Sequence, residues 1–443
     1  MSDEPQTETL PPRTPAPTPS EAPPQPALPV WLTRLLIVGL VLAALNLRPA
    51  ITSLGALLEE VREGLHMSGG VAGVLTSVPP LCFAVFGITA PRLARRFGPG
   101  AIVFAGMAAI TAGLVIRPFT GGTAAFLAAS ALALMGIAVS NVLMPVIVKR
   151  YFPDRVGTMT GLYSMALALG TSLAAAATVP VTDALGGNWR TGLAVWAVLG
   201  ALAVAAWLPL VRDRGRGATE TPAGGAGGAG GATGATDATG ADGTGGQGAP
   251  ARRITRSRTA WALGCFFGIQ ATGAYITMGW MPQIFRDAGV SAGTAGVLLA
   301  VTMVMGVPLA FVIPRLATRM KNQGPIVVAL GLCGLSGYAG LHFAPAAGAW
   351  AWALLLGVSN CAFPLALTMI GMRSRTSGGV VRLSAFAQSV GYLISIPGPI
   401  LIGALYEHTG GWETPLTLMA GLMVPQMIVG VIAGRDRTIE DET

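Results

Sequence analysis

Apolar stretches about twenty residues long recur along almost the whole chain, and this repetition constrains the fold more than any other feature. One such stretch is long enough for a helix to cross the hydrocarbon core of a bilayer. We count twelve of them, at residues 32–58, 69–90, 100–117, 124–148, 157–180, 190–210, 259–285, 291–313, 324–344, 350–371, 380–405 and 413–433. The runs are continuous and do not alternate in ten-residue segments, which favours helices over membrane strands. With 52% hydrophobic and 11% charged residues, the chain is predicted to be an all-α membrane protein in contact with the lipid bilayer.

Two segments lack this apolar character and divide the chain. The first 30 residues contain ten prolines and read as a disordered tail, not as a cleaved leader. Residues 221–250 contain twelve glycines, as expected of a flexible linker. The expected organisation is a tail at 1–30, a six-helix bundle at 31–210, a linker at 211–258, a second six-helix bundle at 259–434 and a tail at 435–443.

The distribution of positive charge predicts the orientation of the chain. If both termini are cytoplasmic, the cytoplasmic segments hold 23 of the 28 Lys and Arg residues and the outer loops hold four, Arg62, Arg117, Arg190 and Arg286. This bias is the one that cytoplasmic loops of membrane proteins carry. The net charge of +8 is then a signal of topology, so no nucleic-acid partner is expected. We expect a multi-pass protein of the cell inner membrane with both termini inside.

The two halves of the sequence repeat each other. Residues 72–75 (AGVL) recur at 295–298, and residues 91–94 (PRLA) recur at 314–317, both at an offset of 223. Ser140, Asn141 and Pro145 recur as Ser359, Asn360 and Pro364 at an offset of 219. Each half therefore has six spans in the same orientation. Such parallel repeats predict a substrate site near the middle of the membrane, where the halves meet.

Several motifs resemble those of a known group. Asn46–Ala50 reads NLRPA, and the segments at 73–83, 90–98, 363–371 and 387–405 have the same resemblance. The chain is similar to the major facilitator superfamily and, within it, to the cyanate and 2-nitroimidazole permease family. The resemblance covers residues 32–433 apart from the linker. It implies twelve helices in two parallel repeats and a secondary transporter for cyanate-like anions or nitrogenous compounds.

Arg48 is the principal candidate for substrate binding. It lies near the middle of the first span, where an arginine costs roughly 2.5–3.5 kcal/mol on insertion scales. The acidic residues all fall in tails, loops or span ends, so none is available at its depth. A ligand with negative charge or strong acceptor oxygens is the simplest partner. The alternative is that Arg48 hydrogen-bonds backbone carbonyls freed by the kink at Pro49.

Other polar residues within the spans are further candidates for the substrate site. Asn141 and Asn360 hold equivalent repeat positions, and tyrosines offer both a ring face and a hydroxyl. The additional candidates are Asn46, Asn141, Asn360, Gln270, Gln388, Tyr163 and Tyr392. For the amides, hydrogen bonds between helices are the competing role, because a buried amide needs partners. Tyr275 has two possible roles, at the cavity or at the membrane interface.

Enzyme chemistry has no support in the sequence. There is no phosphate-binding loop followed by Lys and Ser or Thr, and no cluster of His and carboxylates within the spans. No metal and no cofactor are expected. The preferred interpretation is a monomeric secondary active transporter that moves a small anionic or polar solute by alternating access. The alternatives are efflux of drug-like compounds on the same fold, with Arg48 structural, and a membrane receptor that binds a solute without moving it.

The topology can be tested with one introduced cysteine. In a background from which the four native cysteines are removed, Gly228→Cys should resist an impermeant thiol reagent in intact cells, because the charge bias assigns the linker to the cytoplasm. The same variant should react in inverted membrane vesicles. Labelling from outside intact cells would refute the assigned orientation.

Overall fold

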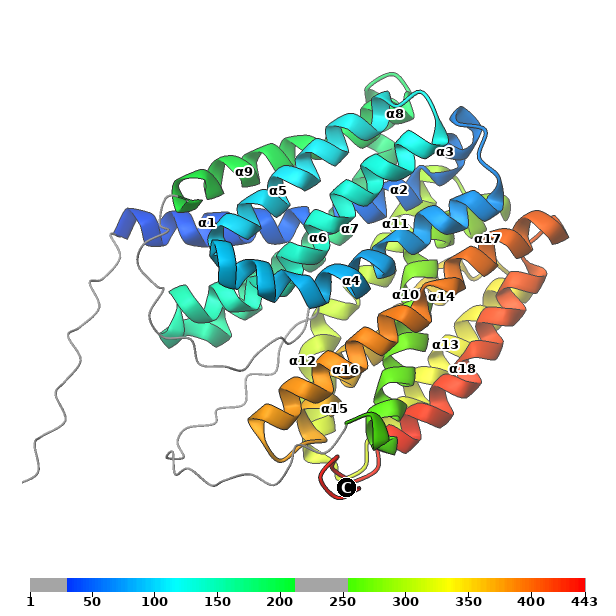
Figure 1. Cartoon of the computed structure of the whole chain (residues 1–443). Helices are drawn as coiled ribbons and strands as arrows, with labels where there is room; N and C mark the ends of the chain where they lie inside the picture. Colours follow the sequence, from blue (N-terminus) through cyan, green and yellow to red (C-terminus); the bar gives the residue numbers. More distant parts are fainter. Residues whose placement is uncertain (1–29, 212–253, 443) are drawn as a thin grey trace, which may run out of the picture.

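The computed structural model describes residues 30–211 and 254–442, and all regular elements in these residues are helices arranged in two bundles (Figure 1). The first bundle contains α1 (Val30–Asn46), α2 (Pro49–Ala56), α3 (Leu58–Gly64), α4 (Gly69–Phe97), α5 (Pro99–Ile116), α6 (Thr123–Tyr151), α7 (Val156–Ala184), α8 (Trp189–Ala194) and α9 (Trp196–Val211), with 3-10 helices η1 (Arg117–Phe119) and η2 (Pro153–Arg155). The second contains η3 (Ile254–Arg256), α10 (Arg258–Asp287), α11 (Ala292–Val304), α12 (Gly306–Arg319), α13 (Gly324–Phe343), α14 (Ala349–Ser359), α15 (Ala362–Met372), α16 (Ser377–Ser395), α17 (Pro397–Thr409) and α18 (Glu413–Ala433). The expected tail at 1–30, except Val30, and most of the expected linker at 211–258 lie outside the described residues.

Several membrane spans are divided into two helices. The first span consists of α1 and α2, and breaks also separate α11 from α12, α14 from α15 and α16 from α17. In the described part of the chain, eleven segments are long and apolar enough to cross a membrane. The remaining one is α10, which is 30 residues long and buries polar side chains such as Gln270 and Gln283 among the other helices. The predicted all-helical membrane fold of two six-span bundles is confirmed.

The two bundles meet closely at one end. The contacts run between α2 and α10, between α4 and both α16 and α17, and between α7 and α11. A Cβ atom added to Gly55 would lie only 2.0 Å from the carbonyl oxygen of Met278, and one added to Gly403 would lie 2.2 Å from that of Gly69. Glycine allows this approach because it has no side chain. The bundles converge near α3 and α17 and spread apart towards the ends of α6 and α15 (Figure 1).

Charged groups also join the bundles at the converging end. The guanidinium of Arg286, in the last turn of α10, forms ion pairs of 2.9 Å with Glu59 and of 2.9 Å with Glu60 in α3. The carboxylate of Glu407 in α17 accepts a hydrogen bond of 3.0 Å from the backbone N–H of Gly70 in α4. This end is therefore closed by both glycine packing and ion pairs.

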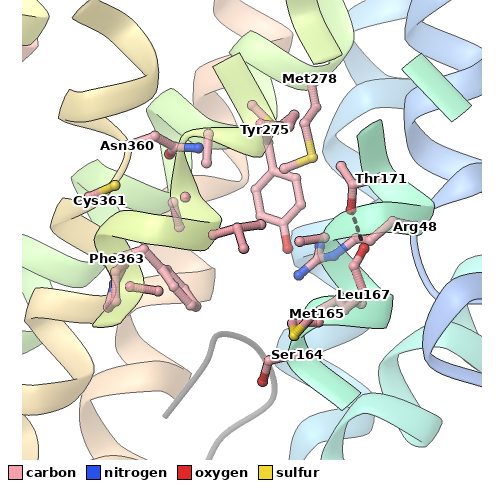
Figure 2. Close-up of a pocket in the computed structure, with 18 of the residues that line it drawn as sticks. Arg48, Ser164, Met165, Leu167, Thr171, Tyr275, Met278, Asn360, Cys361 and Phe363 are labelled. Atoms are coloured by element: carbon pink, nitrogen blue, oxygen red, sulfur yellow. Dashed lines mark hydrogen bonds between the residues drawn. The ribbon is translucent and has the colours of Figure 1, made fainter. Parts of the chain in front are cut away.

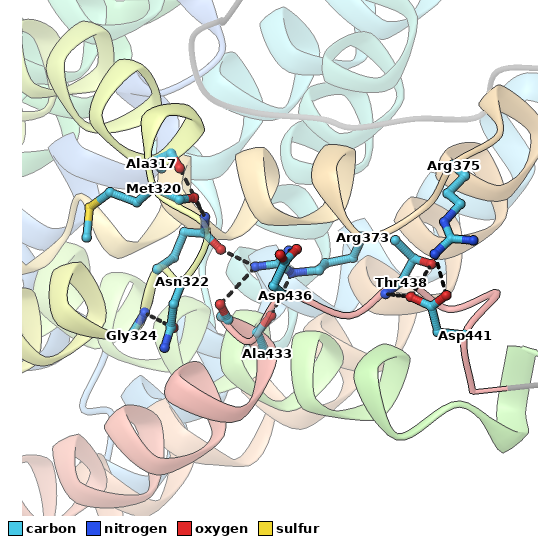
Figure 3. Close-up of polar contacts among 12 residues, drawn as sticks. Ala317, Met320, Asn322, Gly324, Arg373, Arg375, Ala433, Asp436, Thr438 and Asp441 are labelled. Atoms are coloured by element: carbon cyan, nitrogen blue, oxygen red, sulfur yellow. Dashed lines mark hydrogen bonds and ion pairs between the residues drawn. The ribbon is translucent and has the colours of Figure 1, made fainter.

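At the end of the second bundle opposite to the converging end, a buried arginine hydrogen-bonds to the ends of several helices (Figure 3). Arg373 follows α15 and donates from Nε to the Ala433 carbonyl at 3.0 Å and from Nη2 to the Gly434 carbonyl at 2.9 Å. Its Nη2 also donates to Oε1 of Gln323, whose own amide nitrogen donates to the Ala317 carbonyl at 3.0 Å. These bonds link the ends of α12, α15 and α18 to the start of α13.

The C-terminal residues extend this network to α10 and α16. The Ser374 hydroxyl donates to Glu440 at 2.6 Å, while Glu442 accepts from the Ser257 hydroxyl at 2.7 Å and from the Thr259 backbone N–H at 3.0 Å. Burial raises the pKa of both glutamates, but these and neighbouring hydrogen bonds outweigh it, so each pKa lies below its ordinary value. Glu442 also places negative charge at the positive N-terminal end of α10.

We predict that these glutamates stabilise the second bundle in a pH-dependent way. Because their pKa values are lower in the folded protein than in the unfolded chain, their contribution is complete above the unfolded pKa and disappears as the pH falls through the folded pKa. The double variant Glu440→Gln, Glu442→Gln should lose about 1 kcal/mol at pH 7, a value reduced for partial solvent exposure.

Thermal unfolding of the purified protein between pH 3 and pH 7 measures this effect. The wild type and the double variant should differ at pH 7 and converge in acid. Glu63→Gln serves as the control, because Glu63 is an exposed carboxylate of α3 at the other end of the molecule. A constant difference at all pH values would contradict a role for the ionised carboxylates.

Candidate functional site

A cavity of about 190 Å³ lies between the two bundles (Figure 2). Arg48 and α7 form its wall on the side of the first bundle, and α10, α11, α12, α15, α16 and the break between α14 and α15 contribute from the second. Most of the wall is apolar, and its larger apolar side chains are Met165, Leu167, Met278, Met303, Val307, Phe311 and Phe363. A small apolar cavity with a few polar groups is a typical site for a small molecule.

Arg48 reaches this cavity because the first span is broken beside it. α1 ends at Asn46, and α2 begins at Pro49, whose ring supplies a helical φ angle but no N–H. The Arg48 backbone has φ −123° and ψ −27°, and its carbonyl accepts from the N–H groups of Ile51 at 2.9 Å and Thr52 at 3.1 Å. Figure 2 shows the guanidinium at the cavity, with the Tyr275 hydroxyl pointing toward it. Among the residues that the structure describes, no carboxylate forms an ion pair with Arg48.

A different arginine hydrogen-bonds a backbone carbonyl next to Pro49. Arg117, which the sequence placed among the outer-loop charges, is only 1% exposed and lies in η1. Its Nη1 donates to the carbonyl of Ala50 at 3.1 Å, and its guanidinium lies 5.7 Å from the ring centre of Phe126. Arg117 therefore braces the backbone of α2 one residue after Pro49.

Asn360 and Tyr392 are the other two predicted residues on the cavity wall. Asn360 lies between α14 and α15, where its side chain and backbone carbonyl both accept hydrogen bonds from Gln270. Tyr392 comes from α16 and stacks on Phe83 of α4, with the ring centres 5.2 Å apart. The cavity is therefore lined by candidate residues from both halves of the chain.

The remaining predicted residues lie outside the cavity lining. The amide nitrogen of Asn46 faces Met107 in α5, 3.8 Å from its sulfur, because a position two residues before Arg48 lies on another side of the helix. Asn141 accepts a hydrogen bond of 3.3 Å from the Tyr163 hydroxyl within the first bundle. Gln388 donates to a serine one turn earlier in α16, and Gln270 reaches the cavity only through Asn360. Within the described residues, no group of three His, Cys, Asp or Glu side chains could hold a metal ion.

The family model of the Major Facilitator Superfamily matches residues 36–396 of this chain. The chain belongs to the Major Facilitator Superfamily. It is a multi-pass membrane protein, and its family consists of transporters, not enzymes. The expected resemblance to this superfamily is thereby confirmed.

Three curated relatives match over most of their length. The uncharacterized transporter YycB of Bacillus subtilis is 34% identical, with 91% of this chain and 94% of that protein covered. The 2-nitroimidazole transporter of Escherichia coli is 33% identical, with 91% and 96% covered. The cyanate transport protein CynX of Escherichia coli is 28% identical, with 88% and 95% covered. The predicted likeness to this subfamily is confirmed as well.

Solved structures show the same fold at low sequence identity. The nucleoside transporter NupG superposes with a TM-score of 0.68 at 15% identity, covering 91% of this chain and 98% of that one. The D-xylose-proton symporter superposes with a TM-score of 0.67 at 11% identity, covering 93% and 99%. These likenesses establish the fold of this superfamily member and carry no information about its substrate.

Several lining residues of this superfamily member were not singled out from the sequence. The sequence gives no signal that separates these residues from others in the spans. They are Met278, Met303, Ser164 and Thr171. Tyr275, for which two roles were open, also lines it. Its position near the middle of the expected span 259–285 is a signal against the membrane interface, where tyrosines gather at span ends.

Access to the cavity can be tested with a native cysteine. Cys361 lines the cavity and is 1% exposed, so a thiol reagent should reach it only through the cavity. Gly306 also lines the cavity, and a Cβ atom added there would meet no atom within 4 Å. In a protein whose only cysteine is Cys361, Gly306→Leu should slow labelling by methyl methanethiosulfonate several-fold. Gly293→Leu is the control, because Gly293 also faces open space but lies outside the lining. Equal rates in all three proteins would show another route to Cys361.

Proposed function

We propose that this protein is a secondary active transporter of the cell inner membrane that moves a small anionic or polar solute by alternating access, and that it acts as a monomer. The main support for this proposal is that the Arg48 guanidinium lies at a cavity between the bundles and has no carboxylate partner among the described residues. A guanidinium offers donors in a planar fork that suits oxyanions and other paired acceptors. A solute that supplies such acceptors completes the site.

The dimensions of the cavity support a small solute. Its volume of about 190 Å³ is below the roughly 300–1,000 Å³ of pockets that hold drug-sized ligands. This favours a small solute over the drug-like compounds of the alternative efflux function. The rings of Tyr275 and Tyr392 and the thioether of Met278 suit the body of a planar molecule, with its oxygen atoms directed to Arg48. Two relatives are named for transport of cyanate and of 2-nitroimidazole, both small solutes, which supports the same class here.

The contacts at the converging end support a gate for alternating access. Arg286 pairs with Glu59 and Glu60 across the bundles, and all three side chains are partly exposed. Ion pairs of this kind contribute only about 0–1 kcal/mol each, so the end can open at modest cost. With both termini inside, the closed end faces the exterior and the diverging end faces the cytoplasm. A solute that contacts both bundles favours closure around itself and couples binding to the movement.

The positions of the carboxylates indicate which ways of driving transport are available to this protein. The carboxylates of the described residues lie at span ends, in loops or in the C-terminal segment. Proton coupling through a carboxylate in the middle of a span therefore has no candidate in these residues. Exchange of solutes, or movement of a solute together with its own proton, fits the site better.

The role of Arg48 gives the principal test of this proposal. Arg48→Ala should fold at least as well as wild type, because it removes the cost of a charge in the membrane, yet lose about 1.5–3 kcal/mol of solute binding. Arg48→Lys should fall between the two, because it keeps the charge but loses the planar fork. Binding and proteoliposome flux of cyanate, benzoate and 2-nitroimidazole, with thermal unfolding of each variant, measure these effects.

Arg190→Ala is the matched control. Arg190 of α8 donates to the Pro118 carbonyl of η1 at 3.0 Å, so its loss removes an arginine–carbonyl bond away from the cavity. If Arg48→Ala binds the solutes normally but unfolds early, Arg48 has a structural role and the anion site is wrong. Binding without flux would instead support the receptor alternative.

A further inference from the structure

A chain of three amide side chains connects α18 to the cavity wall. Gln426 of α18 donates from Nε2 to Oε1 of Gln270 in α10 at 2.9 Å. Gln270 in turn donates from Nε2 to Oδ1 of Asn360 at 2.9 Å and to the Asn360 backbone carbonyl at 3.2 Å. Both glutamines are at least 95% buried, and neither lines the cavity. Of these three residues, only Asn360 lines the cavity.

The directions of the hydrogen bonds among these three amides follow from a single backbone group, the carbonyl of Asn360. A carbonyl oxygen can only accept, so the Gln270 atom beside the Asn360 carbonyl must be the amide nitrogen. The side-chain atom of Asn360 that meets the same nitrogen must then be its oxygen. The oxygen of Gln270 is left to accept from Gln426. Side-chain amides are often ambiguous between two orientations, but here the backbone removes that ambiguity.

As a consequence, Asn360 presents a donor and not an acceptor to the cavity. Its oxygen is engaged by Gln270, so its NH₂ group is directed away from that contact. In Figure 2 the amide nitrogen of Asn360 lies on the side toward Tyr275, which is the side of Arg48. The cavity therefore has a charged donor from the first bundle and a neutral donor from the second.

We infer that Gln270 and Gln426 are positioning residues that hold Asn360 so that its NH₂ group donates a hydrogen bond to the solute. Because Arg48 and Asn360 both donate, the site selects solutes whose polar groups facing them are hydrogen-bond acceptors only. The inference rests on the proposed function of the cavity. Benzoate and benzamide illustrate the selection, because they have nearly the same shape but benzamide replaces one acceptor oxygen with an NH₂ donor. If the NH₂ group of benzamide faces Asn360 or Arg48, two hydrogen-bond donors face each other and neither has an acceptor. The affinity for benzamide is therefore lower.

Disruption of the positioning pair should reduce this selection. Gln270→Met keeps the length of the side chain but removes its donor, so Asn360 is free to rotate and present its oxygen. We expect benzoate affinity to fall on the order of tenfold, as for the loss of one hydrogen bond to a charged group. Benzamide affinity should fall much less, so the benzoate-to-benzamide ratio should drop. Gln426→Leu should give a smaller change in the same direction, because the bonds between Gln270 and Asn360 remain.

A double-mutant cycle distinguishes positioning from packing. If Gln270 acts through Asn360, Gln270→Met should weaken benzoate binding in the wild-type background and have little further effect in an Asn360→Ala background. Gln283→Met is the matched control, because Gln283 is an equally buried glutamine of α10 that donates to Asp287 and lies outside the cavity lining. Its effect on the ratio should be negligible in both backgrounds. Thermal unfolding of each variant confirms that the compared proteins are folded.

The outcomes separate this inference from the proposal on which it rests. If Gln270→Met weakens benzoate and benzamide equally, or by the same factor with and without Asn360→Ala, the amide chain serves only to join helices and the inference is overturned. If Gln270→Met does not fold, the same criteria apply to Gln426→Leu. If the wild type binds none of the test solutes, or if Arg48→Ala binds them normally, the proposed function itself fails.

Discussion

An arginine held in the membrane without a carboxylate partner among the described residues is the constraint on which the site depends. The charge of Arg48 would be costly on a helix that faces lipid, and Arg48 instead lies at the break where α1 ends and α2 begins at Pro49. The break turns the guanidinium into the space between the bundles instead of toward lipid. Another arginine, the buried Arg117, donates to the Ala50 carbonyl at the start of α2. The break at Pro49 thus places the one charged residue that the structure describes in the cavity wall.

Much of the fold could be predicted because its signals are local and strong. The runs of twenty apolar residues and the repeats at offsets of 223 and 219 residues both lie in the sequence itself. The prediction is weakest at α10, whose buried polar residues lower its hydropathy because it packs among other helices instead of facing lipid. The division of spans into shorter helices was foreseen only at Pro49.

The candidate site was predicted less completely, because residue type does not reveal which side of a helix faces the cavity. Asn46 and Arg48 are two residues apart, yet one packs against α5 and the other reaches the cavity. Gln388 and Asn141 are equally plausible in sequence, but both find partners inside their own bundles. Arg117 was assigned to a loop from its position, and only the packing of η1 against α2 and α6 buries it.

Asn141 and Asn360 hold equivalent positions in the repeated sequence but lie in different surroundings. Each follows a serine and precedes a proline by four residues, and both accept a hydrogen bond on the side-chain oxygen. Asn141 lies inside the unbroken α6, however, where its nitrogen is buried and has no partner among the described residues. Asn360 lies at the break between α14 and α15, so its nitrogen can face the cavity. In the proposed site, Arg48 of the first half would supply the charge and Asn360 of the second half an oriented amide, so one solute would contact both bundles.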